Sequence, residues 1–154
     1  MAAYFTDSSA AVKRYLAEVG SQWVQDLFAV KPPNEFYAVA TIAVEVVAAI
    51  TRRGQGGGIT QPESSRLCDV FLFDLELDFE TVSITDSLLI QAIYLARIYG
   101  LRGYDAVQLA AGLEVNRLRV ASGLSPIIFV SADKELNASA QSEGLAVDDP
   151  NDHS

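Results

Sequence analysis

The stretch that decides the fold is IIFVS at residues 127–131, the most apolar strand-like run in the chain. A loop-forming segment precedes it at 122–126, and a helical pattern follows it over 133–143 until Gly144. Residues 145–147 then form another short apolar run. A strand, a helix and a second strand in this order predict one unit of a parallel sheet.

The same alternation continues towards the N-terminus. We expect further strands at 2–6, 36–40 and 79–84, and helices at 8–18, 21–28, 42–53, from 60 towards 76, from 86 to about 99 and from 104 to about 121. The break GQGGG at 54–58 has helical flanks, which indicates a helix–helix turn. The sequence therefore predicts an α/β fold, a three-layer sandwich with a mainly parallel central sheet and right-handed crossovers.

Composition limits the classes of protein and site. The 154 residues are 50% hydrophobic and 20% charged, so we expect one folded domain over 1–150 and a polar C-terminal tail at 151–154. A single cysteine, Cys68, excludes an intramolecular disulfide and a thiolate zinc cage. The formal net charge of −9 argues against binding nucleic acid through overall charge.

Signals for export and membrane insertion are lacking in the sequence. No basic leader precedes an apolar run near Met1. The longest apolar stretch, 36–50, contains Glu45 and is shorter than the ~20 residues that a membrane span needs. We therefore expect a cytoplasmic protein with no membrane partner.

Four acidic residues follow the predicted strands. Asp7 comes directly after the first strand and Asp133 soon after the IIFVS strand, while Glu45 and Asp105 fall in the opening turns of helices. In parallel α/β sheets, ligands bind beyond the carboxyl ends of the strands. The alternating pattern thus brings four carboxylates from distant parts of the chain to one edge of the sheet.

Each acid also has a structural explanation. Asp7, Asp105 and Asp133 stand where an aspartate can cap a helix. Glu45 is harder to explain in this way, because its helix is otherwise apolar over 42–50 and a buried carboxylate needs a partner. The residues around Asp105 are likewise apolar except for Gln108. A clustered site explains the four acids better than four unrelated caps.

A cluster of this kind needs a cation or protons. Two carboxylates ~5 Å apart repel by about 3 kcal/mol at an effective dielectric constant near 20. All-oxygen ligands suit Mg²⁺ or Mn²⁺ better than zinc. The chemistry that such an ion supports is hydrolysis of a phosphodiester, and the cation would resolve the conflict between an acidic protein and a polyanionic substrate.

Four segments resemble PIN-domain ribonucleases, and more narrowly the VapC-type toxins of toxin–antitoxin pairs. They are YFTDSSA at 4–10, AVE at 43–45, YDAVQLA at 104–110 and FVSAD at 129–133, so the resemblance covers about 4–150. It implies that Asp7, Glu45, Asp105 and Asp133 hold one or two Mg²⁺ or Mn²⁺ ions and that a metal-activated water cuts RNA without a covalent intermediate.

The resemblance implies further roles and partners. Ser9 and Ser131 would contact the acids without binding the metal themselves. The helical pair around 54–58 would serve in homodimer formation and in binding a cognate antitoxin protein. The chain departs from compact VapC-type toxins in the longer segment that runs through 116–126 between Asp105 and Asp133. This departure bears on substrate fit more than on the chemistry.

The remaining charged residues offer few further candidates. Lys13, Arg14 and Arg102 lie near the expected acidic edge, where they are candidate contacts to RNA phosphates as well as ordinary solvated charges. Arg52 and Arg53 end a helix, where cations complement the dipole, and we assign them a structural role. His153, in the expected tail, is predicted to be inert, which excludes Ser–His catalysis.

Two other functions remain open. A non-catalytic binding module would keep the same fold and acids and act through contact with protein or RNA. A receiver-like or phosphatase-like domain is disfavoured, because the residues after Asp7 are serines rather than a second acid and no lysine follows the 127–130 strand in a matching position.

Overall fold

A five-stranded sheet runs through the middle of the protein, which is described over all 154 residues by a computed structural model. Its strands lie in the order β3-β2-β1-β4-β5, and every neighbouring pair is parallel. Their bounds are β1 Ala3–Thr6, β2 Glu35–Val39, β3 Phe79–Val82, β4 Ile128–Val130 and β5 Ala146–Asp148. The predicted parallel sheet is confirmed, with the IIFVS stretch forming β4 beside the central strand β1.

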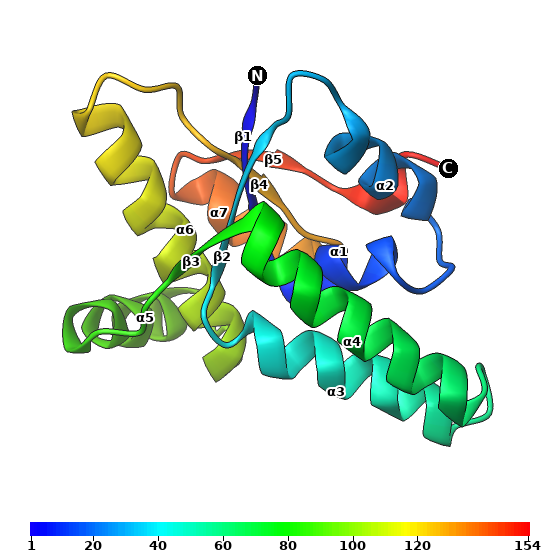
Figure 1. The fold of residues 1–154 in the computed structure, drawn as a ribbon. Helices are drawn as coiled ribbons and strands as arrows, with labels where there is room; N and C mark the ends of the chain where they lie inside the picture. The colour runs from blue at the N-terminus through cyan, green and yellow to red at the C-terminus, as the bar shows by residue number, and fades with distance from the viewer.

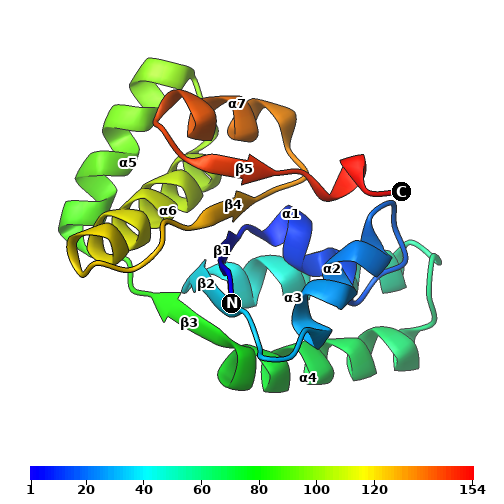
Figure 2. The same cartoon turned by 90° about the horizontal axis from the view of Figure 1, so that it is seen from above.

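Helices cover both faces of this sheet, which confirms the predicted three-layer α/β architecture (Figures 1 and 2). One layer consists of α5 (Asp86–Tyr99), α6 (Gly103–Ala121) and α7 (Lys134–Ser142). The other consists of α1 (Ser8–Ala11), α2 (Ser21–Ala29), α3 (Ile42–Gln55) and α4 (Gln61–Asp78). No helix is both long enough and apolar enough to span a bilayer.

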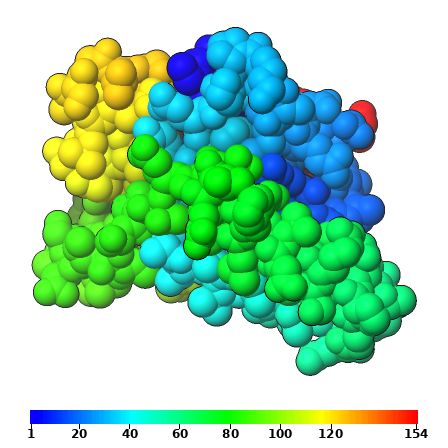
Figure 3. Space-filling view, viewed as in Figure 1, coloured from blue at the N-terminus to red at the C-terminus, as the bar shows by residue number.

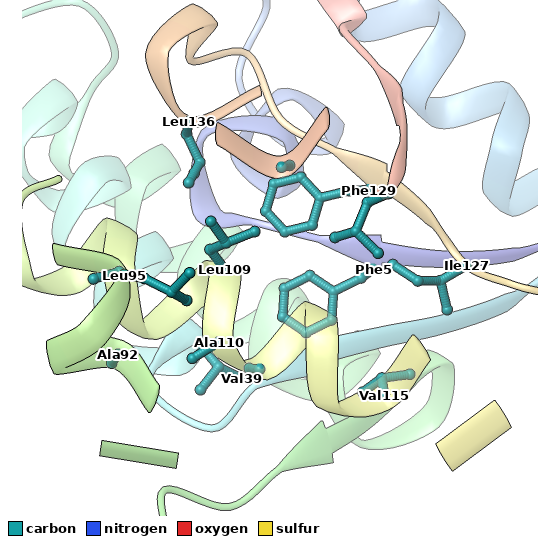
Figure 4. Close-up of a cluster of buried hydrophobic side chains, with 14 of the residues drawn as sticks. Phe5, Val39, Ala92, Leu95, Leu109, Ala110, Val115, Ile127, Phe129 and Leu136 are labelled. Atoms are coloured by element: carbon teal, nitrogen blue, oxygen red, sulfur yellow. The ribbon is translucent and has the colours of Figure 1, made fainter. Parts of the chain in front are cut away.

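The larger part of the core lies between the sheet and the layer of α5, α6 and α7 (Figure 4). Phe5 of β1 and Phe129 of β4 are fully buried and stack with ring centroids 5.5 Å apart. Gly112 of α6 lies against both rings, because a Cβ at this position would stand 2.9 Å from Phe129. This close approach sets the distance between α6 and the two central strands.

A smaller core lies on the opposite face, beneath the hairpin of α3 and α4. Phe71 of α4 packs with Ile42 and Ile50 of α3, and all three are fully buried. The two helices are joined by the glycine-rich turn, as predicted, and they project together beyond the rest of the molecule (Figure 3).

The predicted helix over 8–18 is shorter in the structure. Helix α1 ends at Ala11 and a single 3₁₀ turn follows over Val12–Arg14. The hydroxyl of Ser21 donates to the carbonyl of Leu16 (2.8 Å) and accepts from the amide of Glu18 (2.9 Å). These two contacts satisfy backbone groups that a longer helix would otherwise satisfy, so the chain turns early into α2.

The expected polar tail at 151–154 is also folded against the domain. A 3₁₀ turn spans Pro150–Asp152. The ring of His153 stacks on Trp23 at 4.1 Å between centroids, and its Nε2 lies 2.7 Å from Asp148 Oδ1. The aromatic partner is contributed by α2, which the sequence spacing does not reveal.

The contact at Gly112 predicts a stability effect. Gly112→Ala should destabilise the protein by about 1–3 kcal/mol, because the new methyl group overpacks the site between Phe5 and Phe129. Urea unfolding followed by circular dichroism measures this change. Gly103→Ala in the same helix is the control, since a Cβ there meets nothing within 4 Å. Equal midpoints for both variants would contradict the described packing.

Candidate active site

The carboxyl ends of β1 and β4 meet where the chain reverses its progress across the sheet. From β1 the chain moves to β2 and β3 on one side, and it later returns to β4 and β5 on the other side. Such a reversal leaves a crevice between the connections that follow the two strands. Asp7 follows β1, and its amide donates to Val130 O of β4 at 3.1 Å. Asp133 lies three residues beyond the end of β4.

Asp7 is buried at the carboxyl end of β1, with only 3% of its surface exposed. Its Oδ1 accepts hydrogen bonds from Ser9 Oγ (2.7 Å) and from the amide of Ala10 (3.1 Å), while Oδ2 accepts from Ser131 Oγ (2.9 Å). Burial nevertheless raises the pKa of Asp7 to about 7, with a further contribution from the charge of Asp105. The three donors lower the pKa and only partly offset burial.

The two serines predicted beside the acids both contact Asp7. Ser9 Oγ also accepts from the amide of Ala132 (2.9 Å), and Ser131 Oγ accepts from the amide of Asp133 (3.1 Å). Each hydroxyl therefore links the Asp7 carboxylate to the loop that carries Asp133. Whether the serines act in catalysis stays a prediction.

Glu45 lies in the first turn of α3 and is held by three side chains. Ser8 Oγ donates to Oε2 (2.7 Å) and Thr41 Oγ1 donates to Oε1 (3.1 Å). Gln108 Nε2 lies 3.2 and 3.3 Å from the two oxygens, which joins α3 to α6. The helix that the apolar run over 42–50 predicts as buried is buried on one face only: Val46 is fully buried, whereas Val44 beside Glu45 is 71% exposed. The carboxylate is half-buried and stands at a rim.

Asp105 differs from the other three acids. It lies in the first turn of α6, is 9% exposed, and accepts no hydrogen bond from any protein group. Its pKa is raised to about 6, mainly by burial and also by the charges of Asp133, Glu45 and Glu135, while the charge of Arg102 lowers it. The N-cap position belongs to Arg102, so Asp105 does not cap its helix.

Asp133 caps a helix through one of its two carboxylate oxygens. Its Oδ1 accepts the amide of Leu136 (3.0 Å) at the start of α7, and its Oδ2 has no hydrogen-bond partner. Asp7 caps α1 in the same way through Ala10. The structural explanation of these two acids is therefore confirmed, and it leaves the second oxygen of Asp133 available for another role.

The four acids form a partly assembled group. The Asp105 carboxylate interacts with the charges of Asp7, Glu45 and Asp133. No three His, Cys, Asp or Glu side chains stand close enough to hold a metal ion between them in the present arrangement. The donors fit Mg²⁺ or Mn²⁺ nonetheless, because Mg²⁺ binds through one or two carboxylates and keeps several waters. The unbonded oxygens of Asp105 and Asp133 are the donors best placed for such a role.

Of the three candidate RNA contacts, two are engaged elsewhere. Lys13 is 5% exposed and pairs with Glu18 at 3.3 Å. Arg14 pairs with Asp78 at 2.7 Å and with Asp74. Arg102 forms no ion pair and donates to Tyr104 Oη at 3.0 Å, within the electrostatic reach of Asp105. The structure therefore leaves only Arg102 as a candidate.

Several residues of the site were not predicted. Ser8 and Thr41 orient Glu45, and Glu135 adds a fifth negative charge near Asp105. Gln108 is 1% exposed and its Oε1 is buried without a partner. A polar side chain one turn beyond an acid, in an otherwise apolar helix, is the sequence signal that points to Gln108.

The raised pKa values predict an unusual pH dependence. The folded protein binds protons at Asp7 and Asp105 up to about pH 7 and pH 6, while the unfolded chain loses them near pH 4. Stability without metal should therefore fall as pH rises from about 4 to 7. Melting temperatures in EDTA test this, and Asp7→Asn should flatten the slope, since the amide carries no charge. A wild-type melting temperature that rises over this range, or equal slopes in both proteins, would contradict the buried carboxylate.

Comparison with known proteins supports the fold alone. No protein-family model and no curated protein matches the sequence. Among solved structures, PAE2754 from Pyrobaculum aerophilum matches with a TM-score of 0.61 and 19% identity, over 97% of this chain and 84% of that one. A chain of VapBC2 from Rickettsia felis, solved bound to a DNA fragment from its promoter, matches with a TM-score of 0.62 and 11% identity, over 96% and 98%. The predicted resemblance to the PIN-domain fold of VapC-type proteins is confirmed at the level of the fold.

Proposed function

We propose that the protein is a Mg²⁺- or Mn²⁺-dependent endoribonuclease that hydrolyses RNA phosphodiester bonds at the Asp7, Glu45, Asp105 and Asp133 group. The observation that carries this proposal is the Asp105 carboxylate. It is nearly buried, accepts no hydrogen bond and stands among other acids. A structural role would have given it a donor, because an unpaired buried charge is costly. A cation is the partner that this arrangement needs.

A bound Mg²⁺ or Mn²⁺ would supply a water of lowered pKa and would neutralise negative charge that develops on the phosphate. The side chains of the protein itself hold the carboxylates in position. Ser9 and Ser131 fix the Asp7 carboxylate, and Ser8, Thr41 and Gln108 fix that of Glu45. Oriented carboxylates lose little freedom when a cation and a phosphate arrive.

Protons are the alternative to the cation in the free protein. With a pKa of about 7 for Asp7 and about 6 for Asp105, part of the group is protonated near neutral pH. A cation that displaces these protons would bind more tightly at higher pH. It would also stabilise the fold by about 2.7 kcal/mol at a hundredfold excess over its Kd.

A non-catalytic module that binds RNA or protein is the second candidate. The observation that favours it is that Asp7 and Asp133 do cap helices, which explains two of the four acids without any chemistry. It does not explain Asp105. Loss of RNA cleavage in an Asp105 variant that keeps its fold would separate the two candidates.

The fold also supports an antitoxin-like protein partner, because one matched structure is a VapBC2 complex. We propose that the α3–α4 hairpin receives this partner, as the resemblance implies. Helix α4 carries four exposed apolar side chains there, Val70, Leu72, Phe73 and Leu77. The protein would then act as the toxin of a two-protein pair.

For the homodimer we propose helix α5 in place of the α3–α4 hairpin that the resemblance implies. Ile90, Ile93 and Tyr94 are 59–69% exposed on its outer side, between Asp86 in the first turn and Arg97 in the last. Two copies of α5 packed antiparallel would place each Asp86 opposite the Arg97 of the other copy. The paired face is therefore neutral in a protein of net charge −9.

Cleavage of a mixed, structured RNA pool tests the nuclease. The wild type should cut RNA with Mn²⁺ and not with EDTA, and Asp105→Asn should lower the rate more than about a hundredfold, because even the outer partners of a metal site contribute 10–100-fold. Asp69→Asn is the matched control, since Asp69 is exposed on α4 and forms no hydrogen bond. Cutting that resists EDTA, or equal rates in both variants, would overturn the proposal.

Sedimentation measurements test the homodimer. Ile93→Asp should shift the protein to a monomer by placing charge in the centre of the apolar face. Leu124→Asp, at a 53% exposed apolar position outside α5, should leave the sedimentation coefficient unchanged. A wild-type protein that stays monomeric at high concentration would contradict the assignment of α5.

A further inference from the structure

A groove of about 490 Å³ opens directly beside the acidic group, a volume within the range of small-molecule sites. One wall is α1 with the start of its 3₁₀ turn, contributing Ser8, Ser9 and Val12. The other wall is α3, which lies alongside α1 (Figure 1). Glu45 belongs both to this groove and to the acidic group, so the two are continuous.

The spacing along α3 explains the shape of the groove. Glu45 and Arg52 are seven residues apart, which places them on one face of the helix, two turns or ~10 Å from each other. Ala48 and Ala49 lie between them on the groove wall. Their small side chains leave the space that larger residues would fill.

Arg52 is an unpaired cation at the far end of the groove. Its side chain is exposed and forms neither an ion pair nor a hydrogen bond. The neighbouring cations differ, because Lys13 and Arg53 both pair with Glu18. Arg52 was assigned a purely structural role from its place at the end of a helix, yet it is the basic residue that this groove leaves free.

Tyr104 forms an aromatic wall at the end next to the acids. Its side chain is 53% exposed and lines the groove, and it immediately precedes Asp105. Arg102 donates to its hydroxyl and thereby places a second unpaired guanidinium beside the ring. An exposed aromatic ring that shares a groove with an unpaired cation is the combination that binds single-stranded nucleic acid, by base stacking and by contact with phosphate.

We propose that this groove is a subsite for single-stranded RNA, in which a base next to the scissile bond stacks on Tyr104 and a neighbouring phosphate binds Arg52. The assignment rests on the proposed nuclease function and adds a direction to it, since the strand would run from the acidic group along α3. Duplex RNA does not fit this role, because its bases are already stacked and cannot reach a protein ring.

Binding of a short labelled single-stranded oligoribonucleotide tests the subsite, in an Asp105→Asn background with Mg²⁺ present so that binding is measured apart from cleavage. Tyr104→Ala should weaken binding about tenfold, while Tyr104→Phe should bind as the parent does, because the ring and not the hydroxyl carries the stacking. Circular dichroism checks that each variant is folded.

The salt dependence of oligoribonucleotide binding shows whether Arg52 contacts a phosphate or has only a structural role. For single strands each phosphate contact adds about 0.7 to the slope of log K against log salt. Arg52→Gln should lower the slope by about this amount, whereas Tyr104→Ala should leave it unchanged. Lys31→Gln is the matched control, because Lys31 is an exposed cation with no ion pair. It precedes β2 and so lies at the amino ends of the strands, whereas the acids follow the carboxyl ends.

The outcomes for the subsite and for the nuclease are distinct. One outcome is that the wild type cuts RNA while Tyr104→Ala and Arg52→Gln neither weaken binding nor raise KM. That result would support the nuclease function and contradict the subsite. If both variants lose binding while the wild type cuts nothing, the subsite is supported and the nuclease function is contradicted. Failure of the parent to bind the oligoribonucleotide, or equal binding of duplex RNA, also overturns the subsite and points to a protein segment as the occupant.

Discussion

The Asp7 carboxylate is buried between the ends of β1 and β4, and the site depends on how that negative charge is held. Its donors are the hydroxyls of Ser9 and Ser131 and the amide of Ala10. Ser131 is 124 residues away in the sequence, so this contact exists only when β4 pairs with β1. An unfolded or misregistered β4 would leave the carboxylate without this donor at a buried position, which is unfavourable. The same pairing brings Asp133 to the crevice, so folding of the sheet and assembly of the site are one event.

Helix capping and cation binding are compatible roles for an aspartate in this fold. A cap uses one carboxylate oxygen, as Asp133 does with Oδ1, and the second oxygen remains free. Asp105 shows the opposite case, since it caps nothing and has both oxygens free of hydrogen bonds. Glu45 is intermediate, because Ser8, Thr41 and Gln108 orient it at the rim. The four acids therefore differ in how firmly the protein positions them, and Asp105 is the least constrained of them.

Strand and helix order was predictable because buried β-branched and aromatic runs, glycine turns and capping residues are local signals. Asp7 and Asp133 could be placed for the same reason, since Asp7 directly follows a strand and Asp133 comes soon after one. Two partners of Glu45 could not be predicted, because Ser8 of α1 and Gln108 of α6 contact it only through tertiary packing. The early end of α1 and the docking of His153 on Trp23 likewise depend on tertiary contacts. The burial of Lys13 and its pairing with Glu18 are likewise not visible in the sequence spacing.

A net charge of −9 is compatible with the proposed binding of RNA, because charge acts locally in salt water. At physiological ionic strength exposed charges are screened beyond ~8 Å. Most cations of the chain are neutralised by nearby acids, as in the pairs of Arg14 with Asp78 and of Arg117 with Glu114. Arg52 and Arg102 are not: Arg52 lines the groove beside the acidic group, and Arg102 donates to the hydroxyl of Tyr104, which also lines it. A phosphate in that groove would therefore meet unpaired guanidinium groups first. In the proposed nuclease, a cation bound by the carboxylates beyond them would offset their negative charge.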